Sequence, residues 1–142
     1  MGLQLPVGRI AVLCGPFPAR RRVMAGLDES TGRCSAGHGS LPVCRLRARA
    51  TDPVADRLAS IYGLAHGEAA IVLVDRLTDG LDSAARRQVL AALRDLAGSD
   101  RALLVDDADP VAALAVADAV FRVDSGGEVV REDVGLPEHL MS

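Results

Sequence analysis

The sequence predicts an α/β fold with three layers, in which helices cover both faces of a mostly parallel sheet. Short, continuously apolar runs such as Ala102–Val105 are typical of strands that are buried on both faces. Longer segments between them have apolar residues three or four positions apart, as amphipathic helices do. Because such strands and helices alternate, a parallel sheet is expected. The 142 residues suit one domain, expected at residues 1–132, with residues 133–142 as a loose polar tail.

The first half of the chain is expected to contain one strand and two helices. The strand is predicted from a continuous apolar run, and both helices from apolar residues at helical spacing. Thr51 or Asp52 has a side chain that can cap the second helix, and Pro53 suits its first position. The expected elements are a strand at Ile10–Cys14, a helix over residues 20–27, loops with a short hairpin over residues 28–49 and a helix over residues 53–66.

The second half repeats the alternation of strand and helix. Asp82 and Asp109 each precede a predicted helix and can accept a hydrogen bond from its first turn. Gly126 and Gly127 can form the tight turn of an antiparallel hairpin. The carboxyl ends of the parallel strands should meet at one edge of the sheet, where α/β proteins bind their ligands. The expected elements are strands at residues 70–75, 102–105, 119–123 and 128–131 and helices at residues 83–97 and 110–117.

Composition excludes several classes of function. The net charge of −3 gives no reason to expect a nucleic acid partner, and aromatic residues, at 2%, are too few for base stacking. All 16 basic residues are arginine, which excludes lysine chemistry. No apolar run approaches the roughly 18 residues of a membrane span, so no direct membrane insertion is expected.

No metal site is expected either. The three cysteines form no CxxC pair and are interpreted as reduced thiols of a cytoplasmic protein. The acidic cluster within Asp106–Asp109 lacks the spacing of a calcium loop. We interpret it as a polar strand end followed by a helix cap.

The segment Ile71–Asp82 resembles the Walker B and D-loop segment of ATP-binding cassette (ABC) ATPases. In that family four apolar residues are followed by Asp-Glu-Pro-Thr-x-Gly-Leu-Asp. Residues 57–66, 109–120 and 126–130 are also similar to stretches of the family. The resemblance implies a P-loop NTPase core with a C-terminal hairpin and a nucleotide site at the edge of the sheet. The residues that match the motif are Asp75, Thr78, Gly80, Leu81 and Asp82.

The residues aligned with the family's phosphate loop depart from its pattern. Such a loop reads G-x-x-x-x-G-K-[ST], and its glycines let backbone N–H groups close around phosphates. Arg20 replaces the second glycine, Arg21 the lysine and Arg22 the hydroxyl residue that binds Mg²⁺. The alternative is that these three arginines form a solvated helix start. The resemblance implies a residual site that would hold ATP weakly and without Mg²⁺, formed by Gly15, Arg20, Arg21, Arg22 and Asp75.

The catalytic positions of the family are also replaced. Arg76 stands in place of the catalytic glutamate and Ala108 in place of the switch histidine, so no catalytic residue is assigned. Residues 23–74 are too few for the family's helical subdomain, and nothing in them resembles its Leu-Ser-Gly-Gly-Gln signature. The chain therefore resembles a truncated and degenerate ABC ATPase domain.

Two functional hypotheses follow from this resemblance. In the first, the chain is a non-hydrolysing partner or regulatory subunit that docks on another ABC ATPase subunit or on an associated membrane permease, with Leu81–Asp82 as the contact edge. Such a protein would be cytoplasmic, peripheral to the inner face of the membrane through its partner, and able to dimerise. In the second, it is a weakly ATP-binding, ATP-hydrolysing component of an ABC transporter. A free-standing enzyme is disfavoured because the sequence offers no nucleophile–base pair.

Overall fold

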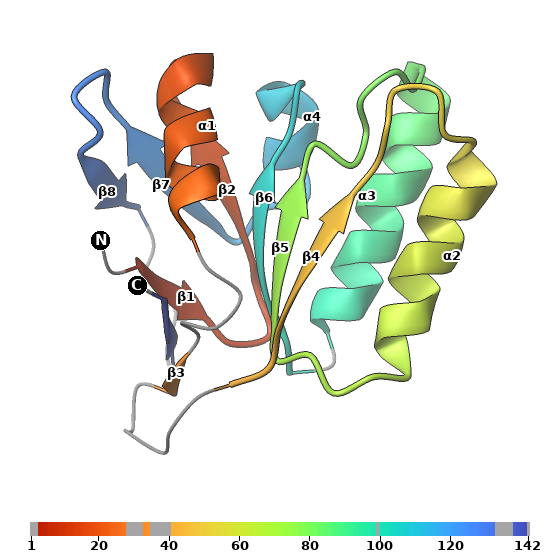
Figure 1. Cartoon of the computed structure of the whole chain (residues 1–142), viewed down its shortest axis with the longest axis horizontal. Coiled ribbons are helices and arrows are strands. Elements are labelled where there is room, and N and C mark those ends of the chain that lie inside the picture. Colours follow the sequence, from red (N-terminus) through yellow and green to blue (C-terminus); the bar gives the residue numbers. More distant parts are fainter. Residues whose placement is uncertain (1–2, 28–32, 35–40, 99, 133–137, 142) are drawn as a thin grey trace.

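The computed structural model describes residues 3–27, 33–34, 41–98, 100–132 and 138–141. Its helices and strands follow one another as the alternating apolar patterns predict over most of the chain (Figure 1). The elements are β1 (Leu3–Pro6), β2 (Ile10–Cys14), α1 (Phe17–Gly26), β3 (Arg33–Cys34), β4 (Val43–Arg47), α2 (Val54–Ala65), β5 (Ile71–Asp75), α3 (Ser83–Ala97), β6 (Ala102–Asp106), α4 (Pro110–Leu114), β7 (Ala119–Val123), β8 (Val129–Arg131) and β9 (Glu138–Met141).

A six-stranded sheet forms the centre of the molecule, with the strand order β4-β5-β6-β2-β7-β8. All neighbouring strands are parallel except β7 and β8, which form the predicted C-terminal hairpin. Every residue of β2, β5 and β6 is buried, as expected for strands that are covered on both faces. The predicted α/β fold class is confirmed.

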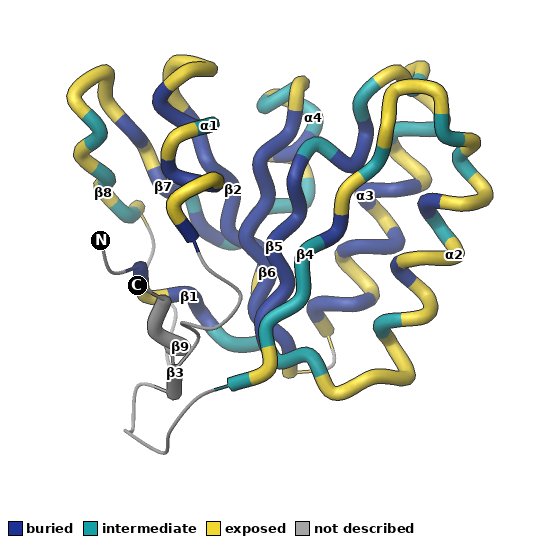
Figure 2. The backbone as a smooth tube through the Cα atoms, in the orientation of Figure 1, coloured by how far each residue is buried: buried dark blue, intermediate teal, exposed yellow. Residues whose placement is uncertain are grey.

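Helices cover the two faces of this sheet and give two cores (Figures 1 and 2). Side chains alternate along β5, so that Val72 and Val74 pack with α2, α3 and α4, whereas Ile71 and Leu73 pack with α1 and β1. On the face that packs with α2, α3 and α4, the predicted apolar stripe of α3 is buried. The three layers therefore result from the period-two pattern of the strands and the helical stripes. The buried stripe of α3 comprises Val89, Leu90, Leu93 and Leu96.

The prediction of loops with a short hairpin over residues 28–49 is wrong at β4. Val43–Arg47 is a parallel edge strand whose residues pair with Ile71–Asp75 of β5. Arginines interrupt its apolar residues, and an edge strand is not buried deeply enough to require a continuous apolar run. Residues 28–32 and 35–40, on which the rest of that prediction falls, lie outside the described residues.

A second, three-stranded sheet was not expected. β1 pairs with β9 in antiparallel orientation, and β9 also pairs with β3. Leu3 and Leu5 of β1 are buried and pack below α1. β9 lies in the segment that the sequence predicts to be a loose tail, so this expectation is not met at Glu138–Met141.

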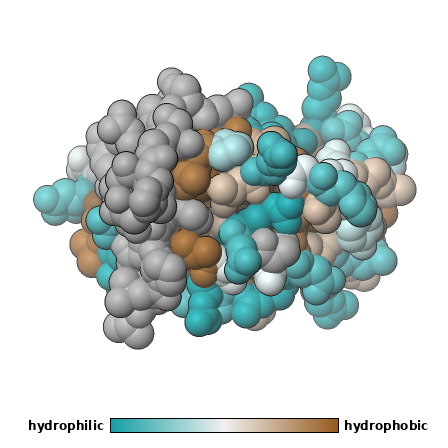
Figure 3. Space-filling view, turned by 90° about the horizontal axis from the view of Figure 1, so that it is seen from below, coloured by the Kyte–Doolittle hydropathy of each residue, from teal (hydrophilic) through white to brown (hydrophobic). Residues whose placement is uncertain are grey.

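Seen from below, the side of the molecule with α2 and α3 is mainly hydrophilic, and the most hydrophobic side chains lie toward the small sheet (Figure 3).

Two helix starts also differ from prediction. α1 begins at Phe17, three residues earlier than expected, after Pro16 as its N-terminal cap. α2 begins after Pro53 without a side-chain cap, because the carboxylate of Asp52 accepts the backbone N–H of Arg49 instead. The cap of α3 is as predicted, with Asp82 accepting the N–H of Ala85 at 2.8 Å.

Candidate functional site

The candidate site lies at the carboxyl ends of the parallel strands, at the top of the view in Figure 1. Asp75 is the last residue of β5 and Asp106 the last residue of β6, and the two are directly paired in the sheet. Their exposed fractions are 4% and 1%. Two neighbouring buried carboxylates must be neutralised or hydrogen-bonded, because an unpaired buried charge is costly. Helix α1, which follows β2, supplies the partners.

Only two residues, Gly15 and Pro16, separate β2 from α1. Gly15 has a φ of +130°, and a Cβ on it would lie 2.1 Å from the backbone oxygen of Val123, so only glycine fits this turn. Pro16 and Pro18 have no N–H group to offer a ligand. Because the helix begins immediately, the chain has no loop here that could wrap around a phosphate.

Arg20 is used inside the protein. Its side chain is buried, with Nη1 2.6 Å from Oδ1 of Asp106 and 2.7 Å from the carbonyl oxygen of Asp107, while Nε donates to the carbonyl of Gly15 at 3.1 Å. The guanidinium also lies 5.6 Å from the ring centroid of Phe17, a cation–π contact. Arg20 therefore joins α1 to the ends of β2 and β6.

Arg21 reaches both carboxylates. Its Nη1 donates to Oδ1 of Asp75 and lies 3.4 Å from Oδ2 of Asp106. Burial by itself would lower the pKa of Arg21, but the hydrogen bonds and charges of Asp75 and Asp106 raise it above the usual value. Burial raises the pKa of Asp106, and the charges of Arg20 and Arg21 oppose this rise.

Three more arginines surround Asp75. Nε of Arg47 lies 3.1 Å from its Oδ2, Nη1 of Arg45 lies 3.7 Å from the same atom, and Nε of Arg76 lies 3.8 Å from Oδ1. The Arg47 side chain is 64% exposed and that of Arg76 40% exposed. Together with Arg20 and Arg21, these arginines outnumber the carboxylates of Asp75 and Asp106, so the immediate surroundings of Asp75 carry excess positive charge.

Of the residues predicted for the site, the structure brings four together and separates one. Gly15, Arg20, Arg21 and Asp75 are linked by the contacts above. Arg22 is exposed and turns toward the β7–β8 connection, where it donates to the carbonyl of Ser125 at 3.2 Å. The sequence pattern does not indicate Arg45 and Arg47 as site residues, because it does not predict β4, the strand that places them beside Asp75.

The motif residue Thr78 belongs to a second polar cluster. Thr78 is fully buried and donates through Oγ1 to Oδ2 of Asp107 at 2.7 Å, while Nε of Arg86 donates to Thr78 at 3.3 Å. Asp107 also accepts the N–H of Asp109, whose own side chain caps α4 through Ala112. The acidic cluster is thus a polar strand end and a helix cap, as its spacing predicts.

Arg57 fixes the connection that carries the motif. Its side chain is 2% exposed and donates hydrogen bonds to carbonyl oxygens before α2 and after β5. Gly80 lies in the latter connection with a φ of +80°, and a Cβ there would lie 2.3 Å from the backbone oxygen of Ala50. A signal for Arg57 was present, since it falls in the apolar stripe of α2 between Val54 and Ile61. The carbonyl groups that it binds are those of Arg49, Ala50, Asp52, Leu77 and Asp79.

The architecture resembles solved structures of ABC proteins. The ATP-binding subunit of an ABC transporter aligns with a TM-score of 0.58 and 10% sequence identity, over 92% of this chain and 80% of that one. A nucleotide-free ATP-binding cassette from an ABC transporter aligns with a TM-score of 0.62 and 7% identity, over 91% and 82% of the two chains. No protein-family model and no curated protein matches the sequence. The chain therefore has the fold of ABC ATPase domains.

This fold implies ATP and Mg²⁺ as ligands, but the residues at the edge of the sheet do not fit them. P-loop NTPases hold the phosphates in a loop of backbone N–H groups, whereas this chain has a two-residue turn between β2 and α1. The carboxylates of Asp75 and Asp106 are already bound by arginines. Arg22 offers no hydroxyl for a metal and adds a like charge. We therefore derive no hydrolytic step for this site.

Proposed function

We propose that this chain is a non-hydrolysing, degenerate protein of the ABC ATPase fold that acts as a partner or regulatory subunit of a transport or membrane-associated system. The observation that carries the proposal is the ion-pair network in which Arg20 and Arg21 occupy Asp75 and Asp106. Nucleotide hydrolysis requires free carboxylate groups for the metal and for the attacking water. In this chain both carboxylates are instead paired with arginines of α1 and hold that helix on the sheet.

The purified chain is expected to release no phosphate from ATP above a buffer control, with or without Mg²⁺. The physical reason is that Arg76 and Ala108 stand at the positions that would activate water, and neither side chain can accept a proton from it. A phosphate-release assay measures this directly. Asp75→Asn is the matched control and should behave as the unmodified chain does. Mg²⁺-dependent turnover that disappears in Asp75→Asn would contradict the proposal.

The proposed partner is another ABC ATPase subunit or an associated membrane permease. Leu81–Asp82 is the proposed contact edge, since the corresponding element lies at the subunit interface in the family that the sequence resembles; Leu81 is half-buried and Asp82 is exposed. In the described part of the chain α2 is the one helix between α1 and β5. Among these residues no helix is long and apolar enough to cross a membrane. In this proposal a cytoplasmic protein reaches the membrane through its partner.

A second candidate function is weak ATP binding without Mg²⁺, supported by the excess positive charge around Asp75. The exposed guanidinium of Arg47 and the partly exposed one of Arg21 face the end of the sheet that the fold uses for ligands. Exposed charges are screened over roughly 8 Å at physiological salt, so we expect a dissociation constant of about 1 mM that weakens with added salt. The excess positive charge does not support the hypothesis that the chain also hydrolyses ATP.

Calorimetric titration with ATP, at low salt and with and without Mg²⁺, tests the second candidate. Arg21→Ala combined with Arg47→Ala is expected to abolish binding, because it removes two of the positive charges beside Asp75. Arg22→Ala is the matched control on the same helix; its side chain turns toward Ser125, and binding should persist. Micromolar, Mg²⁺-dependent binding would mean that a working phosphate site forms. No binding at low salt would reject this candidate and leave the non-binding partner role.

A further inference from the structure

β4 is an edge strand of the six-stranded sheet (Figure 1). Within the described part of the chain it pairs only with β5. The N–H of Ile71 donates to the carbonyl of Pro42 at 3.2 Å, so the backbone groups of Pro42 and of every second residue after it face β5. The backbone groups of Val43 and Arg47 therefore face away from β5. An edge of this kind can accept one more strand.

The two edges of this sheet differ in charge. The Arg47 side chain at the end of β4 is 64% exposed, Arg49 is exposed just beyond it, and the surroundings of Asp75 carry excess positive charge. At the opposite edge, β8 lies between two exposed glutamates, Glu128 and Glu132. Full antiparallel overlap with β4 of a second copy would place arginines of the two copies side by side, and like charges across a strand pair are destabilising. The charge of the β4 edge instead complements an acidic segment.

The side chains of β4 form two rows, one on each face of the sheet. Arg45 lies on the face of α1, where it donates to carbonyl groups of that helix and its C-terminal cap, and Leu46 lies in the core beside α2 and α3. Because side chains alternate along a strand, Arg47 shares the face of Arg45, and Cys44 shares the face of Leu46. An added strand that suits both rows has acidic residues on the first face and apolar residues on the second.

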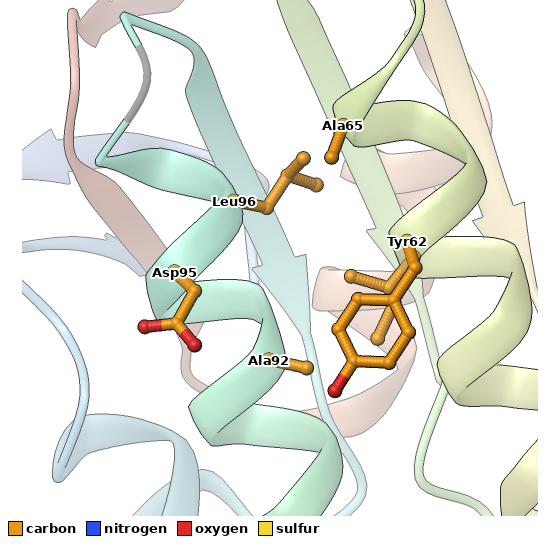
Figure 4. Close-up of a pocket in the computed structure, with 6 residues that line it drawn as sticks. Tyr62, Ala65, Ala92, Asp95 and Leu96 are labelled. Atoms are coloured by element: carbon orange, nitrogen blue, oxygen red, sulfur yellow. The ribbon is translucent and has the colours of Figure 1, made fainter.

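We propose that β4 binds an extended segment of a partner protein by strand addition, and that acidic and apolar residues alternate in this segment. Backbone hydrogen bonds on the open side supply affinity, and the two rows of side chains select the sequence. The mainly apolar groove of about 90 Å³ between α2 and α3 is a different surface, and Asp95 in its wall does not suit an acidic segment (Figure 4). The β4 surface also excludes the Leu81–Asp82 edge. It goes beyond the proposed function, because it does not require the partner to be an ABC protein.

Fluorescence anisotropy with a labelled peptide and the full chain tests this surface. The probe has about ten residues in which glutamate and valine alternate, enough to span β4. The unmodified chain is expected to bind it with a dissociation constant of about 10–100 μM, and more weakly at high salt. A peptide with lysine in place of glutamate should not bind. The glutamate peptide N-methylated along its backbone should bind about tenfold more weakly or worse, because it cannot donate hydrogen bonds to the strand.

Two variants and a substitution-free measurement locate the peptide. Arg47→Ala is expected to weaken binding by about fivefold or more, because it removes the exposed charge beside the peptide. Arg122→Ala is the matched control: its side chain is 58% exposed, also pairs with a carboxylate and lies toward the other edge of the sheet, so binding should persist. Circular dichroism checks that both variants keep the fold. In the unmodified chain, the amides of Val43 and Arg47 should gain protection from hydrogen exchange when the peptide is bound, and those of Val129–Arg131 should not.

Failure of the glutamate peptide to bind at low salt would reject this surface. Equal binding of the N-methylated peptide, or binding that Arg47→Ala does not weaken, would mean that charge attraction elsewhere holds the peptide. Protection of Val43 and Arg47 that rises with the concentration of the chain, without peptide, would assign the edge to a second copy. None of these measurements involves ATP turnover, so failure of this surface and failure of the proposed function are distinguishable.

Discussion

Replacing Arg57 with alanine is expected to lower the free energy of unfolding by about 3–5 kcal/mol, a large part of the stability of a small domain. The guanidinium satisfies carbonyl groups of two connections, the one before α2 and the one after β5. Without it, these oxygens either remain unpaired or admit water into a site that is now closed. Urea unfolding followed by circular dichroism measures the change, provided that the transition is two-state.

Two control variants separate the role of the hydrogen bonds from that of the charge. Arg57→Lys keeps the positive charge but replaces the planar guanidinium with a single ammonium group, which cannot reach both connections. Its stability should therefore lie between that of Arg57→Ala and that of the unmodified chain. Arg122→Ala removes an arginine that pairs with Glu132 at the surface, and its unfolding midpoint should stay close to that of the unmodified chain. If Arg57→Ala were as stable as Arg122→Ala, the two connections would be held by backbone contacts alone.

Most of the fold is predictable from the sequence where burial imposes a strong pattern. β2, β5 and β6 are continuous apolar runs because both of their faces are covered, and α3 shows its buried stripe and its Asp82 cap. β4 escaped prediction because its edge position lets arginines alternate with apolar residues. The three-stranded sheet was not predicted because β1 and β9 pair across nearly the whole length of the chain, and because short strands give little local sequence signal.

The candidate site was predictable only in part, because the sequence indicates some of its residues but not how their charges pair. The motif identifies Asp75, and the aligned phosphate-loop positions identify Arg20 and Arg21. The start of α1 at Phe17 decides where these arginines point. Successive helical residues are turned by about 100°, so Arg20 and Arg21 reach the ends of β6 and β5 while Arg22 turns away. A shift of three residues in a helix start cannot be read reliably from local preference, and here it accompanies an internal ion-pair network of Arg20 and Arg21 with the two carboxylates.

The buried pair of Arg20 with Asp106 makes the second large prediction. Arg20→Met keeps much of the side-chain volume but leaves a carboxylate that is 1% exposed without its closest partner. Breaking a buried ion pair from one side typically costs about 3–5 kcal/mol, and we expect a loss of that size at neutral pH. The double variant Arg20→Met/Asp106→Leu removes both charges and should recover most of the loss, since apolar replacement of a whole buried pair is often neutral. Urea unfolding of the single and double variants measures both effects.

The pH dependence of this loss identifies the carboxylate as its cause. Burial already raises the pKa of Asp106, and Arg20 is the first of the charges that oppose the rise, so its removal should raise that pKa further. In the unfolded chain an aspartic acid has a pKa of about 3.9. In the folded variant Asp106 therefore keeps its proton up to a higher pH than in the unfolded chain. Stability therefore falls as the pH rises between the unfolded and the folded pKa, and the deficit of Arg20→Met should be smaller at about pH 4.5 than at about pH 7.5. The double variant has no carboxylate at residue 106. Relative to the unmodified chain, its stability should therefore change with pH only as far as the loss of Asp106 itself requires. An equal deficit of Arg20→Met at both pH values would mean that lost packing or the carbonyl contacts to Gly15 and Asp107, rather than the unpaired charge, destabilise the variant.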